Sequence, residues 1–200
     1  MNHKNEHYQE LLKLINGLAY TRNTWEVFAD FLEMSAICIS NSIDLINRDK
    51  REKQYLEAIG KYPPEHQKLF PEMFACLVMA LELEMKTRGM TDVLGRLFHE
   101  LELHNKYKGQ FFTPQNVCDM MGKISLSEDD KTIIEKGYIS VYEPCCGSGA
   151  MVLGFTNAMR SYGYDHSTQM LATAVDIDLK CVYMTYILIS LRNFCRCHSR

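Results

Sequence analysis

The chain has 200 residues, of which 46% are hydrophobic and 24% are charged, and these fractions are ordinary for a soluble globular protein. The length fits one large domain or two small ones. A formal net charge of −3 gives no overall attraction to nucleic acid, so contact with DNA would require a local patch or a partner chain.

The placement of the eight cysteines favours a reducing compartment. Cys145 and Cys146 are adjacent, which argues against a disulfide framework. Four others fall within apolar helical patterns that predict buried thiols: Cys38, Cys76, Cys118 and Cys181. The polar start of the chain carries no signal-peptide pattern, and no apolar run reaches membrane-spanning length. We therefore predict a cytoplasmic protein without membrane contact.

Residues 1–107 are predicted to be all helical. Over residues 25–46, apolar side chains recur in steps of three and four, which is typical of one face of an α-helix. Pro71 fits the first turn of a later helix. Thr91 or Asp92 is then predicted to cap a shorter helix. The inner face of that helix is predicted to carry Leu94, Leu97, Phe98 and Leu101.

Residues 108–200 are predicted to mix strands with helices. Thr113 is a natural N-cap and Pro114 a natural first residue for a helix. Apolar residues then follow at helical spacing, namely Val117, Met120, Met121 and Ile124. Further along we predict a short helix within 125–137, strands at 139–143 and 171–176, and helices at 150–162 and 179–194. The second strand lacks polar alternation, which is typical of a parallel strand buried on both faces.

This order of elements predicts an α/β protein. A helical N-terminal domain (1–107) is expected to precede the first part of a doubly wound, Rossmann-like domain (108–200). Because two strands make a poor sheet by themselves, the second domain is expected to be part of a larger fold.

The segment Glu143-Pro144-Cys145-Cys146-Gly147-Ser148-Gly149 joins the first strand to the next helix. A Gly-x-Gly turn in this place lets backbone N–H groups approach a ligand closely. The dinucleotide pattern requires a third glycine three residues further on, where this chain has Val152. Glu143 would repel a pyrophosphate, but it can accept hydrogen bonds from the ammonium group of S-adenosylmethionine. The turn therefore favours S-adenosylmethionine over NAD.

Two acids follow the second predicted strand. Asp176, at the tip of the strand, is the candidate for binding both ribose hydroxyls of the cofactor. Asp178 is predicted to cap the helix that begins at Leu179. The alternative is that both acids only cap that helix.

Two segments together resemble the N6-adenine DNA methylase family, which includes the modification subunits of type I restriction–modification systems. They are Gly109-Gln110-Phe111-Phe112-Thr113-Pro114 and the later segment 143–151. The family couples a Gly-Gln-[Phe/Tyr]-[Phe/Tyr]-Thr-Pro segment to an acid-Pro-x-x-Gly-x-Gly segment in this order. The resemblance runs from about Asp92 to Asn193, roughly half of the chain. It implies a methyltransferase domain that moves a methyl group from S-adenosylmethionine to adenine N6 in DNA.

The resemblance also implies roles for the motif residues. Thr113 and Pro114 would receive the methionine carboxylate at a helix N-terminus. Phe111 or Phe112 would cover the cofactor, while the other ring packs in the core. The methionine and ribose would be lined by the acid-Pro-x-x-Gly-x-Gly segment, whose candidate cofactor-binding residues are Glu143, Pro144, Cys145, Gly147, Ser148 and Gly149. Asp176 would hold the ribose, and Ile177 would pack on the adenine.

The sequence departs from the family in one respect. Family members transfer the methyl group with an [Asn/Asp]-Pro-Pro-[Tyr/Phe] motif that binds the flipped adenine. The adjacent prolines here stand in Tyr62-Pro63-Pro64-Glu65, ahead of the cofactor motif and with different flanks. We therefore expect a truncated, cofactor-binding part of such an enzyme, with no catalytic residue assigned and little methylation by this chain alone.

The implied partners are DNA, reached through other regions or a partner chain, and either a second copy or a complementary methylase or specificity subunit. One alternative is a non-catalytic assembly protein, because an unfinished sheet edge favours association. Another is methyl transfer to RNA or protein. We predict no metal site, since Cys195, Cys197 and His198 lack the paired spacing of a structural zinc site.

Overall fold

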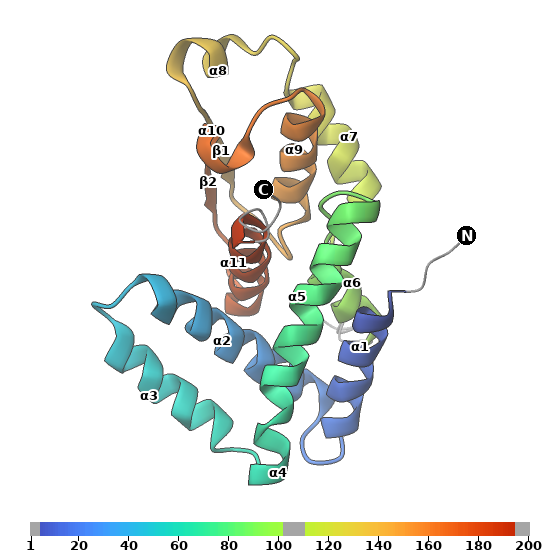
Figure 1. Ribbon diagram of the computed structural model, residues 1–200, viewed down its shortest axis with the longest axis vertical. Helices are drawn as coiled ribbons and strands as arrows, with labels where there is room; N and C mark the ends of the chain where they lie inside the picture. Colours follow the sequence, from blue (N-terminus) through green and yellow to red (C-terminus); the bar gives the residue numbers. More distant parts are fainter. Residues whose placement is uncertain (1–4, 102–110, 195–200) are drawn as a thin grey trace.

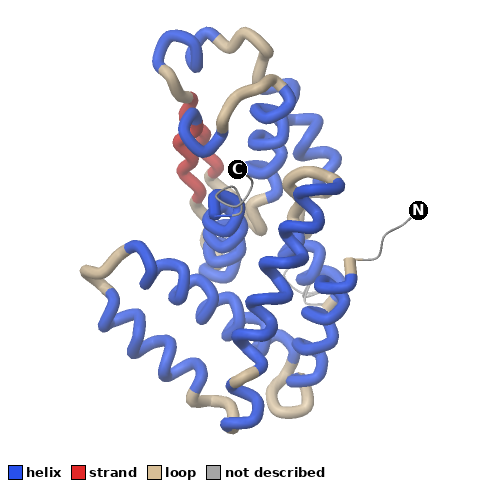
Figure 2. The backbone as a smooth tube through the Cα atoms, viewed as in Figure 1, coloured by secondary structure: helices blue, strands red, loops and turns tan. Residues whose placement is uncertain are grey.

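The computed structural model describes residues 5–101 and 111–194. In the first range it contains helices α1 (Glu6–Leu18), α2 (Thr24–Ile43), α3 (Arg48–Ile59), α4 (Pro64–Gln67), α5 (Leu69–Thr87) and α6 (Val93–Glu100). The second range contains α7 (Gln115–Ser125), α8 (Lys131–Lys136), β1 (Ile139–Glu143), α9 (Ala150–Ser161), α10 (His166–Gln169), β2 (Met170–Ala174) and α11 (Leu179–Phe194). Figures 1 and 2 show helices throughout the molecule and a small sheet beside α9.

Side-chain caps fix the starts of several helices. Asn5 accepts the backbone N–H of Tyr8 at the start of α1, and Asn23 accepts that of Glu26 at the start of α2. Asp92 caps α6, which confirms one of the two predicted caps. The predicted inner face of α6 is also confirmed, because Leu94, Leu97, Phe98 and Leu101 are all buried.

The predicted helix over residues 25–46 is shorter in the structure. α2 ends at Ile43, and the backbone of Asp44 is extended. Ile46 is consequently 93% exposed, and Cys38 is exposed rather than buried. The Asp44 carboxylate binds Arg51 of α3 at 2.8 Å, so the polar turn between the two helices ends the apolar pattern.

One hydrophobic cluster joins the two parts of the chain. It contains Leu11 of α1, Phe28 of α2 and Leu81 of α5, together with Leu153 of α9 and Leu188 of α11. Helix α11 packs directly on α2 (Figure 1). The second part of the chain is therefore anchored on the helical first part through a shared core. The domain division at residue 107 stays a prediction.

The sheet confirms an α/β protein with two parallel strands. β1 pairs with β2 from Ile139 opposite Met170 to Glu143 opposite Ala174. β2 ends two residues before the predicted end, so Asp176 follows the strand at a short distance instead of closing it.

The two faces of this sheet differ. On one face Ile139, Val141 and Met170 pack against a second hydrophobic cluster that includes residues of α9. On the other face Tyr142 and Leu171 are exposed. The prediction that the second strand is buried on both faces is therefore wrong for this chain, because no described helix covers the second face.

Helix α7 also differs from its prediction. It begins at Gln115, and its N-cap position is Pro114 without a side-chain hydrogen bond, so Thr113 is not the N-cap. Its buried residues are Cys118 and Gly122, whereas Met120, Met121 and Ile124 are exposed. The small residues face α9 because the two helices pack closely. A Cβ at Gly122 would lie 2.5 Å from the carbonyl oxygen of Gly154.

Among the described helices, none combines the length and the apolar character that a membrane crossing requires.

Candidate functional site

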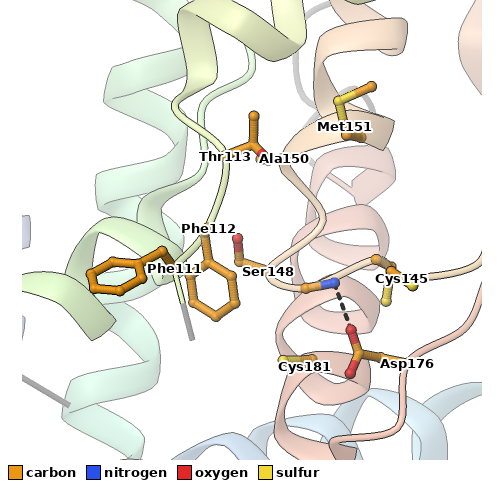
Figure 3. Close-up of a pocket in the computed structure, with 11 residues that line it drawn as sticks. Phe111, Phe112, Thr113, Cys145, Ser148, Ala150, Met151, Asp176 and Cys181 are labelled. Atoms are coloured by element: carbon orange, nitrogen blue, oxygen red, sulfur yellow. Dashed lines mark hydrogen bonds between the residues drawn. The ribbon is translucent and has the colours of Figure 1, made fainter. Parts of the chain in front are cut away.

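A pocket of about 330 Å³ lies where the two sequence motifs meet (Figure 3). It is lined by the segment before α7, the loop between β1 and α9, and residues that follow β2. The lining residues are Phe111, Phe112, Thr113, Cys145, Cys146, Gly147, Ser148, Ala150, Met151, Asp176 and Cys181. The volume is at the lower end of the range for small-molecule sites.

Both glycines of the Gly-x-Gly turn are required by the local geometry. Gly147 and Gly149 have φ angles of 52° and 95°, in the left-handed region that favours glycine. A Cβ on Gly147 would lie 3.0 Å from the ring of Phe112, and one on Gly149 would lie 3.0 Å from Thr185 Oγ1. A side chain at Gly147 would displace the Phe112 ring that lines the pocket, and one at Gly149 would displace Thr185 of α11.

Hydrogen bonds from several elements hold the loop. The Gly147 N–H donates to Asp176 Oδ2 at 2.9 Å (Figure 3), and Thr185 Oγ1 of α11 donates to the Gly147 carbonyl at 3.1 Å. The Cys146 N–H donates to the carbonyl of Val175 at 2.9 Å. The backbone after β1 is thereby fixed against the backbone after β2.

Asp176 and Asp178, which follow β2, both accept backbone hydrogen bonds that order the segment between β2 and α11. Besides Gly147, Asp176 accepts the N–H of Asp178 on Oδ1 at 2.9 Å. Asp178 accepts the N–H of Lys180 at 3.0 Å, which agrees with its predicted place at the start of α11. It also forms an ion pair with Lys180 at 3.1 Å. The sequence did not indicate that Asp176 would hold the glycine loop.

The two aromatic rings before α7 have different surroundings. Phe112 is half-buried and packs on Phe98 of α6, with ring centroids 5.0 Å apart. Phe111 is 72% exposed and stacks on His99, with centroids 6.4 Å apart. Phe112 therefore packs against the core, while Phe111 is exposed at the pocket. The role of either ring in covering a cofactor stays a prediction.

The structure brings most predicted site residues to one place. Seven of them line the pocket, namely Phe111, Phe112, Thr113, Cys145, Gly147, Ser148 and Asp176. The others lie next to these in sequence but are not among the lining residues, namely Pro114, Glu143, Pro144, Gly149 and Ile177. Glu143 Oε1 accepts the N–H of Cys145 at 3.2 Å, and Ile177 is fully exposed. Gly109 and Gln110 of the first motif lie outside the described residues.

Other residues at the site were not predicted from the sequence. Asp92 accepts a hydrogen bond from the Ser148 hydroxyl, although only its capping role was expected. Thr185 and Cys181 come from α11, where they look like ordinary residues of an apolar helix. Met151 lies just after the turn. Asp92 and Ser148 are 56 positions apart in the sequence, and no local sequence pattern predicts a contact over that separation.

The pKa values of two cysteine thiols that line the pocket are raised. Burial raises the pKa of the Cys181 thiol to about 12, and the charges of Asp176 and Asp178 add to this shift. Burial also raises the pKa of Cys146, against a lowering by a hydrogen bond with Thr185. The charge of Asp176 adds to the rise in the pKa of both thiols, so a negative charge is disfavoured at these two sulfur atoms.

The thiol of Cys118, in the first turn of α7, makes a testable contribution to stability. Burial, followed by the charges of Asp119 and Asp92, raises its pKa from 9.0 to about 11. The unfolded thiol therefore loses its proton first, and the free energy of unfolding falls as the pH rises from 9 toward 11. Between pH 8 and 10.5 we expect the wild type to lose about 2 kcal/mol more than Cys118→Ala. Urea unfolding followed by circular dichroism measures this, and parallel pH profiles for the two proteins would contradict it.

Within residues 5–101 and 111–194, no group of three or more His, Cys, Asp or Glu side chains is placed so that it could hold a metal ion. Cys195, Cys197 and His198 lie outside these ranges.

The elements from α6 to α11 thus bring the described residues of both motifs and Asp176 together at one pocket. A scan against models of known protein families matches residues 90–194 to the family described as N-6 DNA Methylase. The match covers more than half of the chain, and the chain belongs to this family. A search of curated proteins and a search of solved structures each gave no match.

Family membership gives the chain a function related to DNA N6-methylation, with DNA as the substrate of the family. The matched region begins at Met90, before α6, and ends with α11. It therefore includes every residue that lines the pocket.

Proposed function

We propose that this chain binds S-adenosylmethionine in the pocket between the two motifs. It would serve as the cofactor-binding part of a DNA adenine-N6 methyltransferase within a modification or restriction–modification system. The observation that carries this proposal is the meeting of Thr113, Gly147, Ser148 and Asp176 around one pocket. S-adenosylmethionine supplies an electrophilic methyl group when it is bound.

The start of α7 suits the carboxylate of the methionine moiety. The helix has eleven residues, and no side chain of the described residues caps its N-terminus. The Val117 N–H donates to the Pro114 carbonyl, so the candidate donors are the N–H groups of Gln115 and Asn116. The positive end of the helix dipole favours an anionic group at this point. We propose that Thr113 and Pro114 place the carboxylate there, and that the exposed ring of Phe111 lies over the cofactor.

The carboxylates of the site suit the cationic and hydroxyl groups of the cofactor. Both Asp176 oxygens accept one backbone N–H each, and each keeps a second lone pair that can accept a ribose hydroxyl. Glu143 has one oxygen on the Cys145 N–H, and its charge suits the ammonium group. We assign the packing on the adenine ring to Ile177, whose exposed side chain follows Asp176.

We also propose the finer architecture that this function implies. The two parallel strands with α9 and α11 would form the first part of a doubly wound, Rossmann-like sheet in residues 108–200, and residues 1–107 the helical N-terminal domain. The strand–helix–strand–helix order supports this assignment. A DNA substrate and reduced thiols support a cytoplasmic location.

Calorimetric titration of the 200-residue protein with S-adenosylmethionine tests the proposal. We expect saturable binding by the wild type and about thirtyfold weaker binding by Asp176→Ala, because the variant loses a charged acceptor and the bond to the loop.

Asp130→Ala is the matched control for this titration. Asp130 also accepts backbone N–H groups, but it does so at the start of α8, outside the pocket lining. Its removal should leave the cofactor affinity unchanged. A folded wild type that shows no saturable heat with S-adenosylmethionine would refute the proposed function.

A second candidate function, assembly with another chain, is favoured by the uncovered sheet face. Tyr142 and Leu171 are exposed on that face, and Met120, Met121 and Ile124 form an exposed apolar stripe on α7. The partner would be a second copy or a complementary methylase or specificity subunit. Sedimentation over a range of concentrations tests self-association, and a second copy is excluded as the partner if the protein stays monomeric at high concentration.

A further inference from the structure

The carboxylate of Asp92 has both oxygens engaged at a point where α6 meets the glycine loop. Oδ1 accepts the N–H of Gly95 at 2.7 Å, which caps the helix. Oδ2 accepts the hydroxyl proton of Ser148, whose side chain is buried next to the pocket. Gly95 makes this meeting possible, because a Cβ there would lie only 2.6 Å from Ser148 Oγ. The capping residue of one helix is thus also a partner of the loop.

The backbone of the same residue is tied to the other motif. The Asp92 N–H donates to Oε1 of Gln115 at 3.0 Å. Gln115 is the first residue of α7 and directly follows Thr113 and Pro114. Asp92 therefore contacts the glycine loop through its side chain and the start of α7 through its main chain.

A polar network keeps Asp92 in this position. Asp119 Oδ1 accepts from Nε2 of Gln115 and from Nδ2 of Asn157, each at 2.9 Å. Asn157 of α9 also binds both backbone groups of Met90, donating to its carbonyl at 2.7 Å and accepting its N–H at 2.9 Å. The segment 90–92 is held between α7 and α9, so Asp92 is a fixed point and not a mobile side chain.

We propose that Asp92 is a positioning residue for the cofactor loop, an inference that rests on the proposed binding of S-adenosylmethionine. Because Ser148 donates its proton to Asp92, the remaining lone pairs of Ser148 Oγ are acceptors only. A buried oxygen that only accepts favours a donor such as the ammonium group of the ligand. Asp92 thus holds the loop in place and also makes Ser148 Oγ a hydrogen-bond acceptor toward the pocket.

Asp92→Asn separates this role from helix capping. Asparagine caps a helix as well as aspartate does, so Oδ1 can still accept the Gly95 N–H. The amide Nδ2 then faces Ser148 and donates to it, which turns the serine proton toward the pocket. If Asp92 only capped α6, the cofactor affinity of Asp92→Asn would equal that of the wild type.

Calorimetric titration with S-adenosylmethionine tests the inference on the wild type, Asp92→Asn, Ser148→Ala and the double variant. We expect about tenfold weaker binding by Asp92→Asn, with a melting temperature close to that of the wild type. The double variant should bind as Ser148→Ala does, because Asp92 acts through the hydroxyl. Asp130→Asn, at the cap of α8, should bind as the wild type does. Wild-type affinity in Asp92→Asn, or an equal loss in the Ser148→Ala background, would overturn the inference.

A measurement on the protein without cofactor keeps this inference separate from the proposed function. Hydrogen exchange of residues 145–150 is expected to be at least tenfold faster in Asp92→Ala than in the wild type, since the loop loses its contact with α6. Asp130→Ala should accelerate exchange at Thr132 and Ile133 of α8 and leave residues 145–150 unchanged. Unchanged exchange of the loop in Asp92→Ala would overturn the positioning role even if the wild type binds S-adenosylmethionine.

Discussion

Replacing Gly154 by alanine is expected to lower the free energy of unfolding by about 3 kcal/mol. Gly154 lies on α9 where this helix crosses α7, and it is buried. A Cβ at this position would collide with the carbonyl of Cys118 and lie 2.8 Å from the backbone N of Asp119. Backbone atoms cannot rotate away as a side chain can, so the two helices would have to separate. Urea unfolding monitored by circular dichroism measures the change.

Gly17→Ala is the control for this prediction. Gly17 is an exposed residue within α1, and nothing lies within 4 Å of the position that its Cβ would take. Alanine there should stabilise the protein by about 0.5 kcal/mol, because alanine has the higher helix propensity. Equal stability of Gly154→Ala and the wild type would show that α7 and α9 tolerate a wider separation.

Patterns within one element predicted much of this fold. β1 and α11 occupy the predicted residues, because apolar runs bounded by polar turns mark both ends. The buried positions of α6 and its Asp92 cap also follow from local rules. These features depend on residues a few positions apart, and the sequence shows such residues directly.

The orientation of α7 depended on a partner that the sequence does not show. Its apolar stripe of Met120, Met121 and Ile124 predicts a buried face, yet these side chains are exposed. The helix instead presents Cys118 and Gly122 to α9, where Gly154 allows the backbones to approach. Close helix packing between small residues outweighs the apolar pattern here, and only the tertiary structure reveals it.

The candidate site, like the fold, was predicted from the sequence only in part. Both motif segments were recognised from short patterns, and six of their predicted residues line one pocket together with Asp176. The contacts that fix the pocket come from far along the chain, as with Asp92 on Ser148 and Thr185 on Gly147. A threonine in an apolar helix carries no local sign of such a role. The motifs therefore predict where a ligand is expected, while the scaffold around them required the structure.

Leu188→Ala is expected to lower the free energy of unfolding by about 3 kcal/mol, as is usual for a cavity left by a buried leucine. Leu188 is fully buried on α11 and belongs to the cluster that includes Phe28 of α2 and Leu81 of α5. Because α11 packs on α2, the cavity should weaken the attachment of the second part of the chain to the first. We expect a single unfolding transition at lower urea, measured by circular dichroism and by the fluorescence of Trp25.

Leu83→Ala is the matched control for Leu188→Ala. Leu83 is 37% exposed on α5, so the same substitution there should cost less than about 1 kcal/mol. Trp25 stands at the start of α2 in contact with the ring of Phe98, and the Lys180 ammonium of α11 lies 4.8 Å from its ring centroid. Its fluorescence therefore reports on the helical part of the chain and on the contact of that part with α11. If Leu188→Ala shifts the fluorescence transition as far as the circular dichroism transition, the two parts unfold as one unit through their shared core. If the fluorescence transition keeps its wild-type midpoint, residues 1–107 unfold independently, which would support the predicted domain division at residue 107.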